Sequence, residues 1–182
     1  MSAQTIYNKL RSAGLSHAGV CGLMGNLMAE SGLVSNIAQR GMTTLSDEDY
    51  TTKFDNAPDS CIRDGVGYGL AQWTYPSRKQ ALWSYARRHG KSVGDEEMQL
   101  DFIVFELGQD YPGLLDFLRS AEDIYAAADR VCREYERPAL NNVDRRYDYA
   151  LRVDARCKSE GDRLSRIIPL LEQIIAILED TA

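Results

Sequence analysis

The sequence is poor in the features of metalloproteins, of disulfide-rich secreted proteins and of membrane proteins. Its 182 residues include four cysteines and two histidines, and no two cysteines have the Cys-x-x-Cys spacing typical of zinc sites. No apolar run approaches the roughly 18–20 residues that span a bilayer. The N-terminus has no basic segment followed by an apolar one, so no signal peptide is evident. We therefore expect no zinc site, no membrane insertion and free thiols, as in a chain made in a reducing compartment.

The chain also lacks an excess of basic residues. It has 21 Lys and Arg against 27 Asp and Glu, a net charge of -6. A nucleic-acid partner usually leaves a basic footprint, so we expect no such partner. The local basic clusters, around residues 78–91 and 145–156, are interpreted as solvated helix faces. With 44% hydrophobic residues and no internal repeat, the chain suits one compact domain with a sizeable core.

Helical periodicity dominates what is present. Ser16 is a good N-cap for a helix that Gly32 ends. Within this helix Gly19, Gly22 and Gly25 recur every three residues, and each costs about 1 kcal/mol of helix propensity. A stripe of small residues lets other backbones approach closely, so we expect this helix to be central.

Further helices are expected on both sides of an irregular middle part. The expected helices cover residues 3–13, 16–31, 76–89, 95–107, 112–119, 121–136 and 143–157, and another starts at residues 46–49. Gly108 is expected to end one of them. Pro58 and the series Gly65, Gly67 and Gly69 indicate turns and a short hairpin. The predicted class is mainly α with a small β element.

The last part of the chain, residues 159–182, differs from the domain expected over residues 1–158. It reads as an amphipathic helix whose apolar residues follow heptad spacing. These residues are Leu164, Ile168, Leu171, Ile175 and Leu178. A seam of about two and a half heptads is marginal alone, so the helix either docks onto the main domain, mediates self-association or serves as a linker.

Glu30 is an unusually placed carboxylate. It is the only acidic residue between residues 1 and 46, and it closes an apolar stretch that includes Leu27 and Met28. Charged side chains rarely stand beside so much apolar surface unless they are paired or needed, and a helix C-terminus disfavours a negative charge. Such a carboxyl suits a general acid, which glycosidic bond cleavage requires. The alternative is a solvated residue at a helix end.

Glu30 belongs to the first of four motifs that occur in a fixed order. The chain reads Gly25-Asn26-Leu-Met-Ala-Glu30-Ser31-Gly32, then Gly67-Tyr68-Gly69-Leu-Ala-Gln72-Trp73, then Arg78, and later Tyr135-Glu136-Arg137-Pro138. This ordered set resembles the phage tail-type lysozymes and phage endolysins of the lysozyme-like superfamily, over residues 5–155. The resemblance implies an α+β lysozyme-like fold, in which a helical domain carries a small β-hairpin beside the active-site cleft.

The resemblance also implies roles for individual residues. Glu30 would be the general acid, and Gln72 with the backbone of Gly69 would bind the sugar or its N-acetyl group. Tyr68 and Trp73 would stack on sugar faces, although a core position for Trp73 is an equal alternative.

Three other residues have two interpretations each. Asn26, one helical turn before Glu30, would orient that carboxyl or contact the substrate. Ser31 would either cap the helix or bind the substrate. Glu136 would either face the cleft as a substrate-binding or supporting residue, or anchor its helix end through Arg137.

A second catalytic carboxylate is missing from its expected position. Animal-type lysozymes have an aspartate directly before the Tyr-Gly-x-x-Gln segment, and here that residue is Gly67. We therefore assign Asp64, in the preceding loop, as the candidate second catalytic residue, with Asp59 and residues 47–49 as alternatives. A water-activating carboxylate well away from Glu30 would imply inversion. No second carboxylate would favour a lytic transglycosylase, in which the substrate's own 6-hydroxyl closes a 1,6-anhydro ring.

The activity that the resemblance implies is that of a muramidase, which cleaves peptidoglycan between N-acetylmuramic acid and N-acetylglucosamine and needs no metal or organic cofactor. Without a signal peptide, the protein would be made in the host cytoplasm and reach the cell wall through a holin or as part of the virion. A lytic transglycosylase and a non-catalytic wall-binding phage structural domain are the alternatives. A helical regulator that self-associates through residues 162–180 would leave the motifs unexplained.

Overall fold

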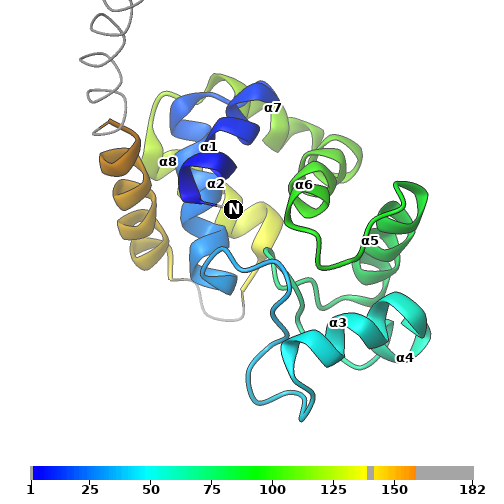
Figure 1. The fold of residues 1–182 in the computed structure, drawn as a ribbon. Helices are drawn as coiled ribbons and strands as arrows, with labels where there is room; N and C mark the ends of the chain where they lie inside the picture. Colours follow the sequence, from blue (N-terminus) through cyan, green and yellow to red (C-terminus); the bar gives the residue numbers. More distant parts are fainter. Residues whose placement is uncertain (1, 139–141, 159–182) are drawn as a thin grey trace, which may run out of the picture.

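The computed structural model describes residues 2–138 and 142–158, and in this part helices surround one central helix, α2 (Figure 1). The helices are α1 (Ala3–Ser12), α2 (His17–Ser31), α3 (Asp47–Asn56), α4 (Pro58–Ile62), α5 (Pro76–Arg88), α6 (Glu96–Asp110), α7 (Pro112–Ser120), α8 (Ile124–Arg130), the π-helix η1 (Val131–Glu136) and a final helix over 143–158. The mainly α class is confirmed. In Figure 1, α3 and α4 lie at one end of the molecule, away from α1, α7 and α8.

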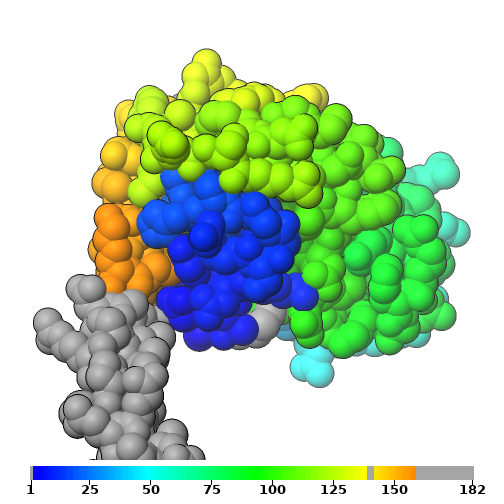
Figure 2. Space-filling view, turned by 90° about the horizontal axis from the view of Figure 1, so that it is seen from above, coloured from blue at the N-terminus to red at the C-terminus, as the bar shows by residue number. Residues whose placement is uncertain are grey.

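The glycine stripe of α2 explains its central position. A Cβ on Gly19 would collide with the backbone of α7, one on Gly22 with α8, and one on Gly25 with the carbonyl of Arg146 in the final helix. Three helices therefore approach α2 more closely than a side chain would allow. Figure 2 shows the same enclosure from above, with α1 and α2 in blue between the final helix in orange and α5 and α6 in green. The prediction that α2 is central is confirmed.

Most helix boundaries follow the local signals in the sequence. The side chains of Ser16, Ser46 and Asp95 accept hydrogen bonds from the first turns of α2, α3 and α6. Gly32 ends α2 in the left-handed conformation, with φ of 66°. The boundary predicted at Gly108 is wrong, because α6 continues to Asp110 before Pro112 opens α7.

The predicted β-hairpin is also wrong in its extent. No strand occurs in the described ranges, and only isolated bridges join Tyr68 to Ala38 and to Trp73. The Tyr68 and Trp73 backbones exchange hydrogen bonds of 3.2 and 2.9 Å across a tight turn. Gly69 and Gln72 have φ of 75° and 46°, which is turn backbone and not extended backbone. The pairing therefore stops after one residue on each side.

Two further predictions concern the heptad seam and membrane insertion. The heptad seam falls within residues 159–182, outside the described residues. Over 2–138 and 142–158, no helix combines the length and apolarity that a membrane crossing needs.

Candidate active site

Two adjoining hollows form one groove where α2, α5 and η1 meet. The larger, of about 560 Å³, is lined by Glu30 and Gln72 among others, and the smaller, of about 470 Å³, reaches Glu106. The residues that line both are Tyr75, Arg78, Glu136 and Arg137. Each hollow lies within the range of about 300–1,000 Å³ that small-molecule sites occupy.

Glu30 is held in this groove by an arginine from the final helix. Arg146 Nη2 lies 2.6 Å from Glu30 Oε1, and Arg146 Nη1 donates to Asn26 Oδ1 at 3.0 Å. Asn26 is fully buried, and its Nδ2 donates to the carbonyls of Gly22 and Ala128 at 2.8 and 2.9 Å. Of the two roles expected for Asn26, the geometry therefore fits orientation of Glu30, through Arg146, and not contact with a substrate.

Glu136 is the second carboxyl in the same hollow. It is the last residue of η1, and its Oε1 is buried with no hydrogen-bond partner among the described residues. Burial raises the pKa of Glu136 well above its usual range, and the charge of Glu30 raises it further, while Arg78 and Arg146 act in the opposite direction. Burial and the charge of Glu30 both disfavour the charged form of Glu136. Glu136 thus faces the cleft, as one of its two interpretations expected.

Gln72 lies in the groove and Gly69 lies behind it. Gln72 Nε2 donates to the Gly69 carbonyl at 2.9 Å, and the Gly69 amide donates to the Ile37 carbonyl at 2.9 Å. A Cβ on Gly69 would collide with the Gln99 side chain, which supports the same turn from inside. The backbone groups of Gly69 are therefore used within the turn, and Ala71 and Gln72 are the residues of this turn that line the larger hollow.

Tyr68, Trp73 and Ser31 do not meet the expectation that they bind sugars. Tyr68 and Trp73 have no exposed surface, so neither ring offers a face to a sugar. Tyr68 Oη lies 2.6 Å from Thr51 Oγ1. Ser31 is buried, and its hydroxyl donates to the carbonyls of Leu27 and Leu70. These three side chains join the turn to the core because their polar atoms are used there.

Asp64 is engaged elsewhere. Its Oδ1 lies 2.9 Å from Lys79 Nζ, its Oδ2 accepts from the Tyr50 hydroxyl at 2.8 Å, and Oδ1 also accepts from the Val66 amide at 2.9 Å. Burial lowers the pKa of the fully buried Lys79, and Asp64 opposes that shift. Asp64 is absent from the residues lining either hollow. Its partners fit a residue that supports the fold.

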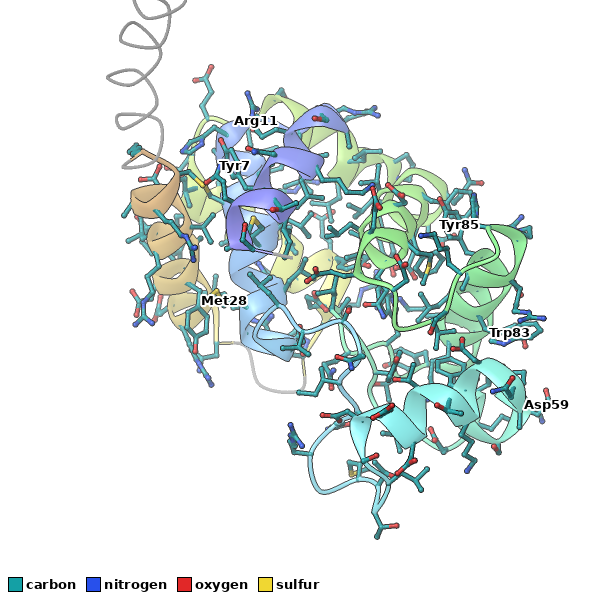
Figure 3. All side chains as sticks on the ribbon, viewed as in Figure 1. Tyr7, Arg11, Met28, Asp59, Trp83 and Tyr85 are labelled. Carbon is teal, nitrogen blue, oxygen red and sulfur yellow. The ribbon has the colours of Figure 1, made fainter. Side chains whose placement is uncertain are left out.

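The alternative Asp59 is further removed. Its side chain is exposed and lies at the outer edge of the molecule, on α4 (Figure 3). The loop before the turn therefore brings neither aspartate into the groove.

Glu106 is the saturated carboxylate of the groove. Arg78 Nε and Nη2 lie 2.7 and 2.8 Å from its two oxygens. Its Oε2 also accepts from Trp73 Nε1 at 3.1 Å and from the Tyr135 hydroxyl at 2.7 Å. This network fixes Arg78, the arginine of the third motif, between the two hollows.

A separate cluster offers potential metal ligands. The ligand atoms of His17, Cys21 and Asp154 lie within 4.8 Å of one another, and none of these residues lines the groove. Both imidazole nitrogens already have partners, since Nδ1 lies 2.7 Å from the Tyr7 hydroxyl and Nε2 lies 2.6 Å from Asp154 Oδ1. Figure 3 labels Tyr7 on α1, beside α2. The cluster fits a polar contact between helices, and the prediction of no metal stays a prediction.

Sequence reasoning missed one residue that lines the groove, Tyr75, and one that supports it from behind, Arg146. Arg146 belongs to a basic cluster interpreted as solvated, yet it is 6% exposed; its helical spacing with the buried Ala150 and Val153 was a usable signal. Tyr75 is 67% exposed and lines both hollows. It lies just beyond the Gln72-Trp73 motif, and no pattern singled it out.

Comparison with known proteins gives two results. A family model described as "Phage tail lysozyme" matches residues 1–154, a range that includes Glu30, Glu136 and Arg146. The chain is also 28% identical over 153 residues to the "Morphogenesis protein 1" of Bacillus phage B103, with 80% of this chain and 36% of that protein covered. The chain thus spans about a third of the length of that relative.

Proposed function

Because the chain belongs to the phage tail lysozyme family, we propose that it is a muramidase that cleaves the glycan strands of peptidoglycan between N-acetylmuramic acid and N-acetylglucosamine. The observation that carries this proposal is the carboxyl of Glu30, anchored by the buried Arg146 and facing a groove of about 560 Å³. The name of the phage relative favours a role in the virion over release through a holin.

In the proposed mechanism Glu30 is the general acid. It donates its proton to the glycosidic oxygen as the bond to the sugar breaks, and negative charge then develops on its carboxyl. Water adds to the oxocarbenium ion that is left and releases one proton, so that the carboxyl can be protonated again. Arg146 Nη2 lies 2.6 Å from this carboxyl and stabilises the charge. The guanidinium group need not move, because its Nη1 is already hydrogen-bonded to Asn26. A charge-assisted hydrogen bond that is placed before the reaction lowers the barrier where charge forms.

The groove offers complementary contacts for an amino sugar. The exposed ring of Tyr75 at the junction of the hollows is suited to stacking on a sugar face. Gln72 uses its Nε2 within the turn and so directs its amide oxygen to an N-acetyl N–H. The exposed Arg137 lines both hollows and would attract the carboxylates of the lactyl group or wall peptide.

A lytic transglycosylase is the second candidate. It is favoured by the engagement of Asp64 with Lys79 and Tyr50, because the expected water-activating aspartate then does not face the groove. Digestion of purified peptidoglycan followed by mass spectrometry separates the two. Reducing ends at N-acetylmuramic acid support the muramidase, 1,6-anhydro ends identify a transglycosylase, and N-acetylglucosamine reducing ends contradict the bond assignment.

A wall-binding domain without activity is tested with the same material. The Glu30→Gln variant should bind sedimented cell walls as the parent does and release no soluble muropeptides. Asp59→Asn, at an exposed position of α4, is the matched control and should release muropeptides at the parental rate. A parent protein that binds walls and releases nothing would identify a structural domain.

A further inference from the structure

We propose that Glu30 and Glu136 form a coupled pair that holds a single proton, and that Glu136 thereby keeps Glu30 able to act as a proton donor. This inference rests on the proposed role of Glu30 as the general acid. It makes Glu136 a positioning residue for the proton, a role distinct from anchoring a helix end.

The first argument is the arrangement of unsatisfied groups around Arg146. Both carboxyls line the larger hollow, Glu30 from α2 and Glu136 from η1. Arg146 bonds only Glu30 and Asn26, and its buried Nε has no hydrogen-bond partner among the described residues. The buried Oε1 of Glu136 has none there either. A buried carboxylate without donors is costly, whereas a neutral carboxyl is tolerated.

The second argument is a count of charges. Four carboxyls line the two hollows; Asp110 is exposed, and the other three, Glu30, Glu106 and Glu136, are set against the two guanidinium groups that act on Glu136, Arg78 and Arg146. Arg78 is committed to Glu106 and Arg146 to Glu30. One negative charge therefore remains without a cation. One bound proton restores the balance.

The other nearby cation, Arg137, also lines both hollows, but solvent screens the charge of its exposed guanidinium group. Arg137 follows Glu136 in the chain, but its side chain is exposed and its Nε donates to the Glu134 carbonyl at 2.8 Å. The backbone also sets Glu136 apart, because η1 has π-helical geometry and Arg137 has a φ of 49°. Such conformations are frequent at functional sites.

The chemical consequence concerns where the proton resides. Two like charges in one buried site cannot both form easily, so the pair titrates in two separated steps and its proton belongs to both groups. The raised pKa of Glu136 agrees with this picture. In this proposal the charge of each carboxyl disfavours loss of the remaining proton from the pair, which stays available to Glu30.

The test is the pH dependence of kcat/KM on soluble glycan oligomers. Glu136→Gln removes the like charge and keeps the shape, so its alkaline limb should move to lower pH by about one unit or more. Activity should remain at acidic pH and be lost at the parental optimum. Glu136→Asp, which keeps the charge, should retain the alkaline limb of the parent. Glu134→Gln is the control, because Glu134 pairs with Arg130 on the same segment.

Three results separate the possible failures. An unshifted limb in Glu136→Gln with a uniformly reduced rate would overturn the coupled pair and leave the proposed function standing. A Glu30→Gln variant with parental activity would contradict the proposed function, whatever the profile of Glu136→Gln. A shifted limb in Glu136→Gln that also occurs in Glu134→Gln would show a general effect of charge and would overturn the pair.

Discussion

Two glutamates of the groove, the buried Glu106 and the partly buried Glu136, differ in how their oxygens are satisfied. Glu106 accepts four hydrogen bonds, two from Arg78 and one each from Trp73 and Tyr135. Glu136 has a buried oxygen with no partner among the described residues. A saturated carboxylate stabilises the charged form and stiffens its surroundings, whereas an unsatisfied one is poised to hold a proton. A position in the groove is therefore not enough to identify which carboxyl takes part in the reaction.

The largest expected effect comes from replacing Glu106, the glutamate that accepts four hydrogen bonds. Glu106→Gln leaves Arg78, whose side chain is 15% exposed, without a counter-ion, and we expect the free energy of unfolding to fall by about 3 kcal/mol, the lower end of the range for buried pairs. Urea unfolding monitored by circular dichroism measures it. An effect below about 1 kcal/mol, as exposed ion pairs give, would contradict the bracing role of Glu106.

A second change tests the same idea at Asp64. Asp64→Asn leaves Lys79 with a weakened partner, and we expect a loss of stability of about 2 kcal/mol, less than for Glu106 because Asp64 is 25% exposed. Once corrected for the folded fraction, muropeptide release should match that of the parent. A large loss of specific activity would contradict this role and would support Asp64 as the second catalytic carboxylate.

Glu136, whose buried oxygen has no partner among the described residues, should make the folded protein less stable as the pH rises. The pKa of folded Glu136 is raised above its unfolded value, so its contribution to stability is fully present below about pH 4.3 and is lost as the pH rises towards the folded pKa. The free energy of unfolding of the parent should thus fall relative to Glu136→Gln, by at most about 1.4 kcal/mol per pH unit. Melting curves of both proteins between pH 4 and 8 measure the difference; parallel curves would contradict a buried proton on Glu136.

A smaller effect sharpens the assignment of the groove. Tyr75→Ala removes the exposed ring at the junction of the hollows, and we expect KM to rise about ten-fold, the equivalent of about 1.4 kcal/mol, with unchanged stability. Tyr125→Ala, an exposed tyrosine outside the groove, is the matched control. Equal values of KM for both variants would exclude stacking on Tyr75.

Local signals in the sequence predicted much of the fold. Ser16 and Gly32 bound α2 as predicted, and the stripe of Gly19, Gly22 and Gly25 predicted its central position. The helix end predicted at Gly108 was wrong, because a glycine inside a helix is tolerated when the backbone hydrogen bonds continue past it.

The site was predicted less completely, for a physical reason. Glu30 was recognisable because it is the only carboxylate between residues 1 and 46 and follows an apolar stretch of the sequence. The states of Asp64 and Glu136 depend on partners far along the chain, Lys79 and Arg146 among them. Such pairings are set by the packing of helices and leave little periodic signal near either residue.

The central claim is that Glu30 donates the proton that breaks the glycan, and its most direct test is the initial rate at which reducing ends appear in purified glycan strands. The account predicts that Glu30→Gln is folded, binds the strands and is slowed by about 10²–10⁴-fold, the range for loss of a general acid. A folded Glu30→Gln protein that cleaves the strands at the parental rate would contradict it.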